Sequence, residues 1–183
     1  VAMFAGDAYA SVQLAAFDAR PGLIAIHAVA GIVFATSVPL QVWPPFRARQ
    51  PSLHRYIGYT FVAPAWLMSA TGVAVAYVYP FAGRAGVIPN IVSALLLMLF
   101  TAQAVASARR TDIAAHQRWV MRAVAVGLGI ALSRVYLPVL VNGFDLPPDQ
   151  AMAQVFWLGS GTNLALVESW IRREKFGRLT NAG

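Results

Sequence analysis

The sequence predicts an all-α fold, a polytopic transmembrane helix bundle of about five spans. The chain of 183 residues is 58% hydrophobic and only 11% charged, so it is more apolar and less charged than soluble domains are. Its apolar residues gather in stretches of about 20, long enough for a helix to cross a hydrocarbon core of about 30 Å. The alternating pattern of barrel strands is absent, so helices are the expected way to cross lipid.

Five apolar stretches follow one another along the chain, separated by residues that end helices. They cover residues 23–43, 57–80, 88–108, 119–141 and 151–171. The Trp-Pro-Pro sequence at 43–45 closes the first stretch. Glycine and proline in segment 83–89 separate the second stretch from the third, and those in 142–148 separate the fourth from the fifth. Residues 23–171 are therefore expected to form one transmembrane bundle.

The two ends of the chain differ from this bundle. Residues 1–22 contain Asp7 and Asp18, which favours an external amphipathic segment over a span. Since the chain opens on Val1 rather than Met, an upstream portion, such as a further helix, is expected to have been trimmed. Residues 172–183 form a basic tail, and no second domain is indicated.

Short basic connectors predict the orientation in the membrane. One side collects Arg47, Arg49, Arg55, Arg109, Arg110, Arg118, Arg122, Arg172, Arg173, Lys175 and Arg178. By the positive-inside rule that side is cytoplasmic, with the N-terminus outside and the C-terminus inside. The chain is thus predicted to be a multi-pass protein of the cytoplasmic (inner) membrane. Topology explains the net charge of +7, so the lipid bilayer is the expected partner and nucleic acid is not.

Several kinds of chemistry find no residues to support them. The chain has no cysteine, which excludes disulfides, thiolate metal sites and cysteine nucleophiles. No glycine-rich phosphate loop, carboxylate pair or Ser-His-Asp set is visible either. The sequence therefore indicates no stand-alone enzyme activity.

Two histidines near the basic ends of different spans form the first candidate site. Small residues follow His54 and His116 at helical spacing along each helix, and both rings are expected to face inward. Such a pair suits the iron of a b-type haem, with Arg55, Arg118 and Arg122 as partners of the propionates. The same basic rim could serve a quinone. The alternative is that small residues serve helix packing and that histidines beside arginines meet water or lipid phosphate.

His27 and Arg134 form a second candidate site, in the outer half of the bundle. No carboxylate lies at the depth of Arg134 in any predicted span, so its expected partners are backbone carbonyls, His27, Tyr136 or an anionic ligand. The alternative is an arginine that extends to the interface.

Two further polar side chains in the last stretch are expected to be structural. Glu168 should pair with Arg122 or Arg118, and Asn163 should form a hydrogen bond between helices.

Three segments together resemble a prokaryotic integral-membrane family, the domain of unknown function 2306. They are residues 49–58, 112–122 and 134–138, which read RQPSLHRYIG, DIAAHQRWVMR and RVYLP. The resemblance covers roughly residues 23–141 and implies a membrane protein without an assigned activity, in which one more helix often precedes the first span. His27, His54, Arg55, His116, Arg118, Arg122 and Arg134 match its motif positions. A weaker similarity links 27–31 and His54 to four-helix transmembrane b-type cytochromes.

Three functions follow as hypotheses. The first is a redox protein that binds a b-type haem or a quinone. The second is a membrane carrier or sensor of a small anion or lipid, acting through His27 and Arg134. The third is an accessory subunit of a larger membrane complex.

Overall fold

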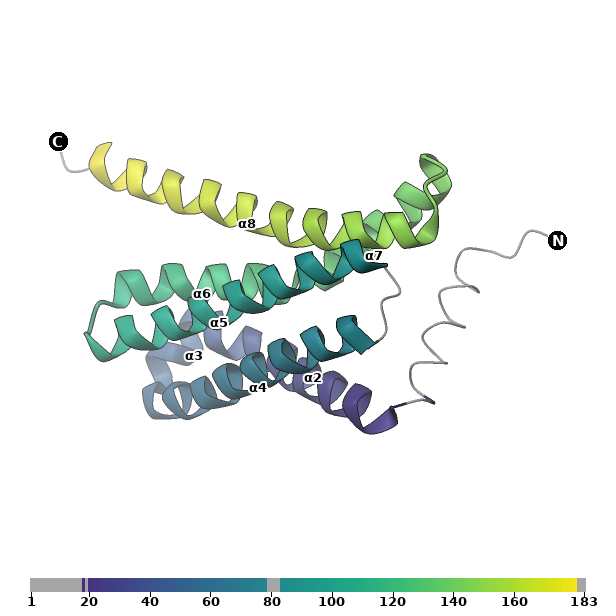
Figure 1. Ribbon diagram of the computed structural model, residues 1–183. Helices are drawn as coiled ribbons and strands as arrows, with labels where there is room; N and C mark the ends of the chain where they lie inside the picture. The colour runs from purple at the N-terminus through teal and green to yellow at the C-terminus, as the bar shows by residue number, and fades with distance from the viewer. Residues whose placement is uncertain (1–17, 19, 79–82, 181–183) are drawn as a thin grey trace.

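A computed structural model describes residues 18, 20–78 and 83–180, with side chains up to Arg173 (Figure 1). All regular structure in these ranges is helical. The elements are α2 (Pro21–Val42), α3 (Pro44–Arg49), α4 (Pro51–Val78), η1 (Arg84–Gly86), α5 (Val87–Arg109), α6 (Ile113–Gly127), α7 (Gly129–Pro138), the π-helical turn η2 (Val139–Gly143) and α8 (Pro148–Thr180). The predicted external segment 1–22 falls almost entirely outside the described residues.

Proline and capping residues explain where the helices begin. Proline opens α2, α3, α4 and α8, where its missing N–H removes no helical hydrogen bond. Asp112 caps α6, and its carboxylate accepts a hydrogen bond of 2.9 Å from the N–H of Ala115. The left-handed backbone of Thr111, at φ 59°, makes the sharp turn between α5 and α6.

Four helical stretches of the described chain are long and apolar enough to cross a membrane. They are Pro21–Val42, Pro51–Val78, Arg84–Arg109 and Ile113–Gly143. The fifth predicted span lies within α8, whose polar residues, among them Gln154, Asn163 and Glu168, keep it below the same apolarity. Four spans are thus supported, while the fifth stays a prediction. α8 also continues to Thr180, beyond the predicted end of that span at residue 171.

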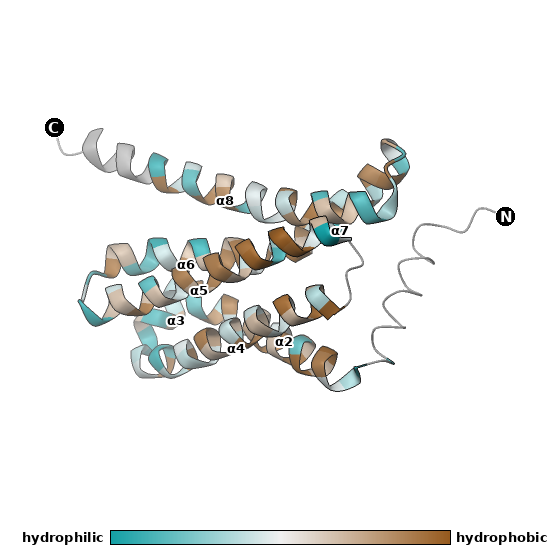
Figure 2. Ribbon diagram, in the orientation of Figure 1, coloured by the Kyte–Doolittle hydropathy of each residue, from teal (hydrophilic) through white to brown (hydrophobic). Residues whose placement is uncertain are grey.

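The long helices α2, α4 and α5 and the stretch formed by α6 and α7 run alternately in opposite directions (Figure 1). α4 packs against α2 and α5, α6 packs against α5, and α8 packs against α6 and α7. The turns at α3 and between α5 and α6 therefore lie at one end of the molecule, together with the C-terminal end of α8 (Figure 1). Hydrophilic residues gather at this end, and hydrophobic residues fill the middle of the helices (Figure 2).

The centre of the bundle is a small, tightly packed core. Its buried members are Phe34, Val38, Phe61, Ala65, Leu97, Ala123 and Val126, which come from α2, α4, α5 and α6. Large apolar side chains also cover the outside: Ile32 is 63% exposed, Leu95 62% and Leu166 64%. Apolar residues on both the inside and the outside are what a helix bundle in lipid requires.

The predicted continuous stretch 119–141 is interrupted at Leu128, between α6 and α7. Close contacts surround the interruption, because the ring of Phe34 occupies the space beside Gly127 and the backbone of Gly159 lies against that of Gly129. Glycine has no side chain to prevent such approaches. The interruption thus accompanies the contact of Phe34 with Gly127 and the tight packing of α7 on α8.

Candidate functional site

The basic end of the bundle brings together residues that are far apart in the sequence. His54 lies in the first turn of α4, and His116 in the first turn of α6. α5 runs between these two helices in the chain order and packs against both, so the two first turns meet at the same end.

His54 and His116 are direct neighbours. Their ring centroids lie 6.5 Å apart, and the ring planes are nearly perpendicular, at 84°. His116 donates a hydrogen bond of 2.9 Å from Nδ1 to the carbonyl oxygen of Ala104 on α5, which orients its ring and leaves Nε2 for another partner.

Two buried side-chain atoms of the described residues lack a hydrogen-bond partner, and both lie at this end. They are Nδ1 of His54 and Oγ of Ser107. Ser107 lies one turn beyond Ala104 on α5, so it shares the helix face that receives His116. Buried polar atoms without partners are uncommon in folded proteins, and each needs an explanation.

The small residues above the histidines do not leave room there, contrary to the expectation for a haem between these faces. Ala65 and Ala123 are 0% exposed and belong to the core. The space beside Gly127 is taken by Phe34. This part of the bundle follows the alternative interpretation, in which small residues serve helix packing.

The three arginines predicted beside the histidines have different surroundings. Arg122 is engaged by Glu168: Nε lies 2.5 Å from Oε1 and Nη2 lies 3.0 Å from Oε2. The same guanidinium covers the ring of Trp119, at 4.7 Å from its centroid. Arg55 donates a hydrogen bond of 3.4 Å to Ser52, and both Arg55 and Arg118 are exposed.

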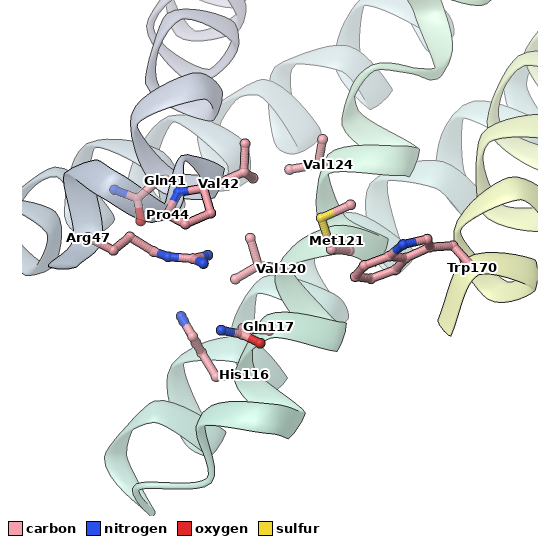
Figure 3. A pocket seen from close by; sticks show the side chains of 10 residues that line it. All are labelled: Gln41, Val42, Pro44, Arg47, His116, Gln117, Val120, Met121, Val124 and Trp170. Atoms are coloured by element: carbon pink, nitrogen blue, oxygen red, sulfur yellow. The ribbon is translucent and has the colours of Figure 1, made fainter. Parts of the chain in front are cut away.

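A cavity of about 480 Å³ lies on the other side of α6 (Figure 3). It is lined by Gln41, Val42, Pro44, Arg47, His116, Gln117, Val120, Met121, Val124 and Trp170. These residues come from α2, α3, α6 and α8, and none comes from α4 or α5. His116 is thus shared: it lies beside His54, is hydrogen-bonded to Ala104, and also lines the cavity.

The second predicted site divides between different parts of the bundle. Nδ1 of His27 lies 3.0 Å from the hydroxyl oxygen of Thr71, and this hydroxyl donates to the carbonyl of Leu67. The His27 ring also lies beside Gly72. Arg134 is exposed on α7, which packs on α8, whereas α2 packs on α4. His27 and Arg134 thus lie on helices with different packing partners. An anion site formed by the two residues stays a prediction.

The polar residues of α8 join it to the rest of the bundle. Glu168 pairs with Arg122, one of its two expected partners. The side chain of Asn163 donates a hydrogen bond of 3.0 Å to the carbonyl of Ala125. Both contacts join α8 to α6, as expected of interhelical polar groups.

The sequence analysis missed Gln41, Arg47, Gln117 and Trp170 as neighbours of the site. Arg47 was used there only to predict the orientation in the membrane. Gln41 could have been predicted as a site residue, because it is an amide near the end of an apolar stretch. It is buried, and it donates a hydrogen bond of 3.2 Å to the carbonyl of His54.

Comparison with known proteins agrees with this picture of a membrane bundle. The family described as "Predicted membrane protein (DUF2306)" matches residues 24–171, which is most of the chain. No curated protein and no solved structure matches. The matched range includes His54, His116, three of the four apolar helical stretches in full and the first from residue 24 onward. The chain therefore belongs to the predicted membrane protein family DUF2306.

Proposed function

We propose that this protein is a redox protein of the cytoplasmic membrane that binds a b-type haem, which His54 and His116 would hold through its iron. The observation that carries the proposal is the separation of 6.5 Å between the two ring centroids. A metal ion held between two imidazoles, about 2.0 Å from each nitrogen, separates the ring centroids by roughly 6 Å. The two rings thus have the spacing that axial ligation needs.

The hydrogen bonds around the rings support the same role. A histidine that ligates a metal usually donates its other ring N–H to a carbonyl or carboxylate, which fixes its orientation. His116 does so toward Ala104. Nδ1 of His54 is buried without a hydrogen-bond partner in the described chain. A ligand that binds this nitrogen would offset the free-energy cost of burying it unpaired.

The closed core restricts where a macrocycle would lie. Because Ala65, Ala123 and Phe34 fill the bundle above the histidines, a flat group would have to lie at the level of the rings, where α4 and α6 begin. Arg55 and Arg118 are exposed at that level and suit carboxylate pairing. Arg122 is not expected to pair with a cofactor carboxylate, since Glu168 already binds it.

A bound haem would supply one-electron chemistry, and the protein would supply its ligation, orientation and electrostatic surroundings. The arginines at the basic end would favour the cofactor's carboxylates. By the positive-inside rule this end faces the cytoplasm. Haem binding would therefore lie close to the cytoplasmic surface of the membrane.

The test is the visible spectrum of the full chain, purified in detergent after expression with ample haem precursor. We expect a Soret band that shifts on reduction with dithionite. His54→Ala and His116→Ala should each lose the band or convert it to a five-coordinate spectrum.

His27→Ala is the matched control, because His27 is engaged by Thr71 and lies outside the pair. It should keep the wild-type spectrum. A colourless wild-type protein that is folded by circular dichroism would overturn the proposal. It would bring forward the anion site at Arg134 or a role as an accessory subunit.

A further inference from the structure

The cavity on the α2–α8 side of His116 is not used by the proposed haem site. Its volume of about 480 Å³ lies in the range of about 300–1,000 Å³ that is typical of small-molecule sites. It lies at the basic end, since its lining includes the end of α2, Pro44 and Arg47 of α3, residues 116–124 of α6 and Trp170 of α8.

The lining is divided into a polar and an apolar part. Arg47, Gln41, His116 and Gln117 lie toward one side, while Met121, Val124 and Trp170 lie toward the other (Figure 3). The side chain of Arg47 extends toward the centre of the cavity (Figure 3). A ligand that fits this division has a hydrogen-bond-accepting head and an apolar body.

The polar side chains that line the cavity indicate which class of ligand it can bind. A phosphate or carboxylate headgroup is usually met by several cations, but Arg47 is the one Lys or Arg side chain among the described lining residues. The other polar donors in the lining are the neutral amides of Gln41 and Gln117, since the Nδ1–H of His116 is already donated to Ala104. Uncharged carbonyl oxygens suit such amide donors, and the indole of Trp170 offers a flat face to a planar ring.

We infer that this cavity binds the head of a lipid-soluble quinone, with its ring carbonyls accepting hydrogen bonds from Arg47 and Gln117. The start of its apolar tail would lie against Val120, Val124 and Met121. Binding follows from the cavity alone, whereas the role of the quinone as electron partner rests on the proposed haem. His116 borders both sites, so it would provide the shortest route between them.

The electron balance is simple. Oxidation of one quinol to a quinone releases two electrons and two protons. A haem held by His54 and His116 would supply one-electron chemistry, so the two electrons of one quinol would require two protein molecules. The two protons would leave to water at the basic end of the bundle.

Binding is tested by quenching of tryptophan fluorescence, using decylubiquinone as the probe and the full chain in detergent. We expect saturable quenching by the wild type. Arg47→Gln should weaken binding about tenfold or more, because it removes a charge-assisted hydrogen bond. Gln117→Leu should weaken it less. Arg49→Gln is the matched control, since Arg49 is exposed on the same short helix and does not line the cavity.

The outcomes separate the two proposals. His54→Ala should remove the haem but keep quinone binding, because His54 does not line the cavity. A haem-free wild type that binds the probe would retain the quinone site and remove the electron-transfer role. Quenching that does not saturate, or that Arg47→Gln and Gln117→Leu leave unchanged in folded protein, would overturn the inference. Displacement of the probe by palmitate at equal or lower concentration would also overturn it, in favour of an acyl anion.

Discussion

Gly159 lies where the backbones of α7 and α8 approach most closely. A side-chain carbon at this position would collide with the carbonyl of Gly129, and one at Gly129 would collide with the hydroxyl of Ser160 and lie only 3.0 Å from its backbone. Backbone atoms cannot move aside as the end of a flexible side chain can. Single residues of this kind therefore determine how near two helices come.

Gly159→Ala should destabilise the protein by about 1–3 kcal/mol, because the added methyl group overpacks the contact between α7 and α8. The measurement is the free energy of unfolding in mixed micelles. Gly161→Ala is the control on the same helix, where nothing lies within 4 Å of the added atom. It should stay within about 0.5 kcal/mol of the wild type. Equal changes in both variants would show that the close contact at Gly159 does not control the effect, since helix propensity alone would favour alanine at both positions.

The ion pair between Arg122 and Glu168 is a second feature of single residues. The side chain of Arg122 is 18% exposed and that of Glu168 is 36% exposed, so the pair is partly shielded from solvent. Arg122→Ala should cost about 1–3 kcal/mol, because it leaves a half-buried carboxylate without its partner. The double variant Arg122→Ala/Glu168→Ala should cost less than the sum of the single variants. Arg118→Ala, an exposed neighbour, should have little effect. Additive losses would contradict a coupled pair.

At the scale of helices, α8 is the element whose position in the bundle is hardest to predict from its amino-acid composition. Its packing on the bundle depends on specific pairs: Ser160 with Ser93 of α5 at 3.3 Å, Thr162 with Tyr136 of α7 at 2.9 Å, and Asn163 with Ala125 of α6. These contacts are distributed over three helices. α8 thus belongs to the bundle, although it is less apolar than the four other stretches.

The absence of cysteine from the chain allows a clean test of this packing. Ser93→Cys combined with Ser160→Cys should form a disulfide under mild oxidation, because the two hydroxyl oxygens lie 3.3 Å apart. The readout is protection from alkylation, followed by mass spectrometry. Ser93→Cys with Ser169→Cys is the control, since residue 169 lies more than two turns further along α8. Equal crosslinking of both pairs would show that α8 is not held in this register.

At the scale of the whole molecule, the gathering of arginines at one end predicts the orientation. If α8 spans the membrane and the basic end is cytoplasmic, Thr111→Cys and Arg173→Cys should react with an impermeant maleimide only after the membrane is opened. Asp145→Cys, at the opposite end, should react in intact cells. These positions are all exposed. Reaction of Arg173→Cys and Asp145→Cys from the same side would show that α8 does not cross.

The sequence by itself determined the helical class, four of the apolar stretches and the residues that end them, because lipid requires long apolar helices and proline and glycine interrupt them. It also predicted that Glu168 pairs with Arg122 or Arg118, and that His54 and His116 lie at the same end of the bundle. It could not predict the break at Leu128 or the close contact of Gly129 with Gly159, since these depend on which helices become neighbours.

The packing of the helices determines which polar side chains pair with each other and which of them line the cavity. The sequence placed His54, His116 and three arginines at one end, but only the packing shows that Glu168 binds Arg122, that core side chains close the space above the histidines, and that His116 borders a cavity with Arg47. The physical reason is that helical periodicity gives the face of each residue on its own helix. Which faces meet, and what space remains between them, is determined by side-chain packing across the bundle.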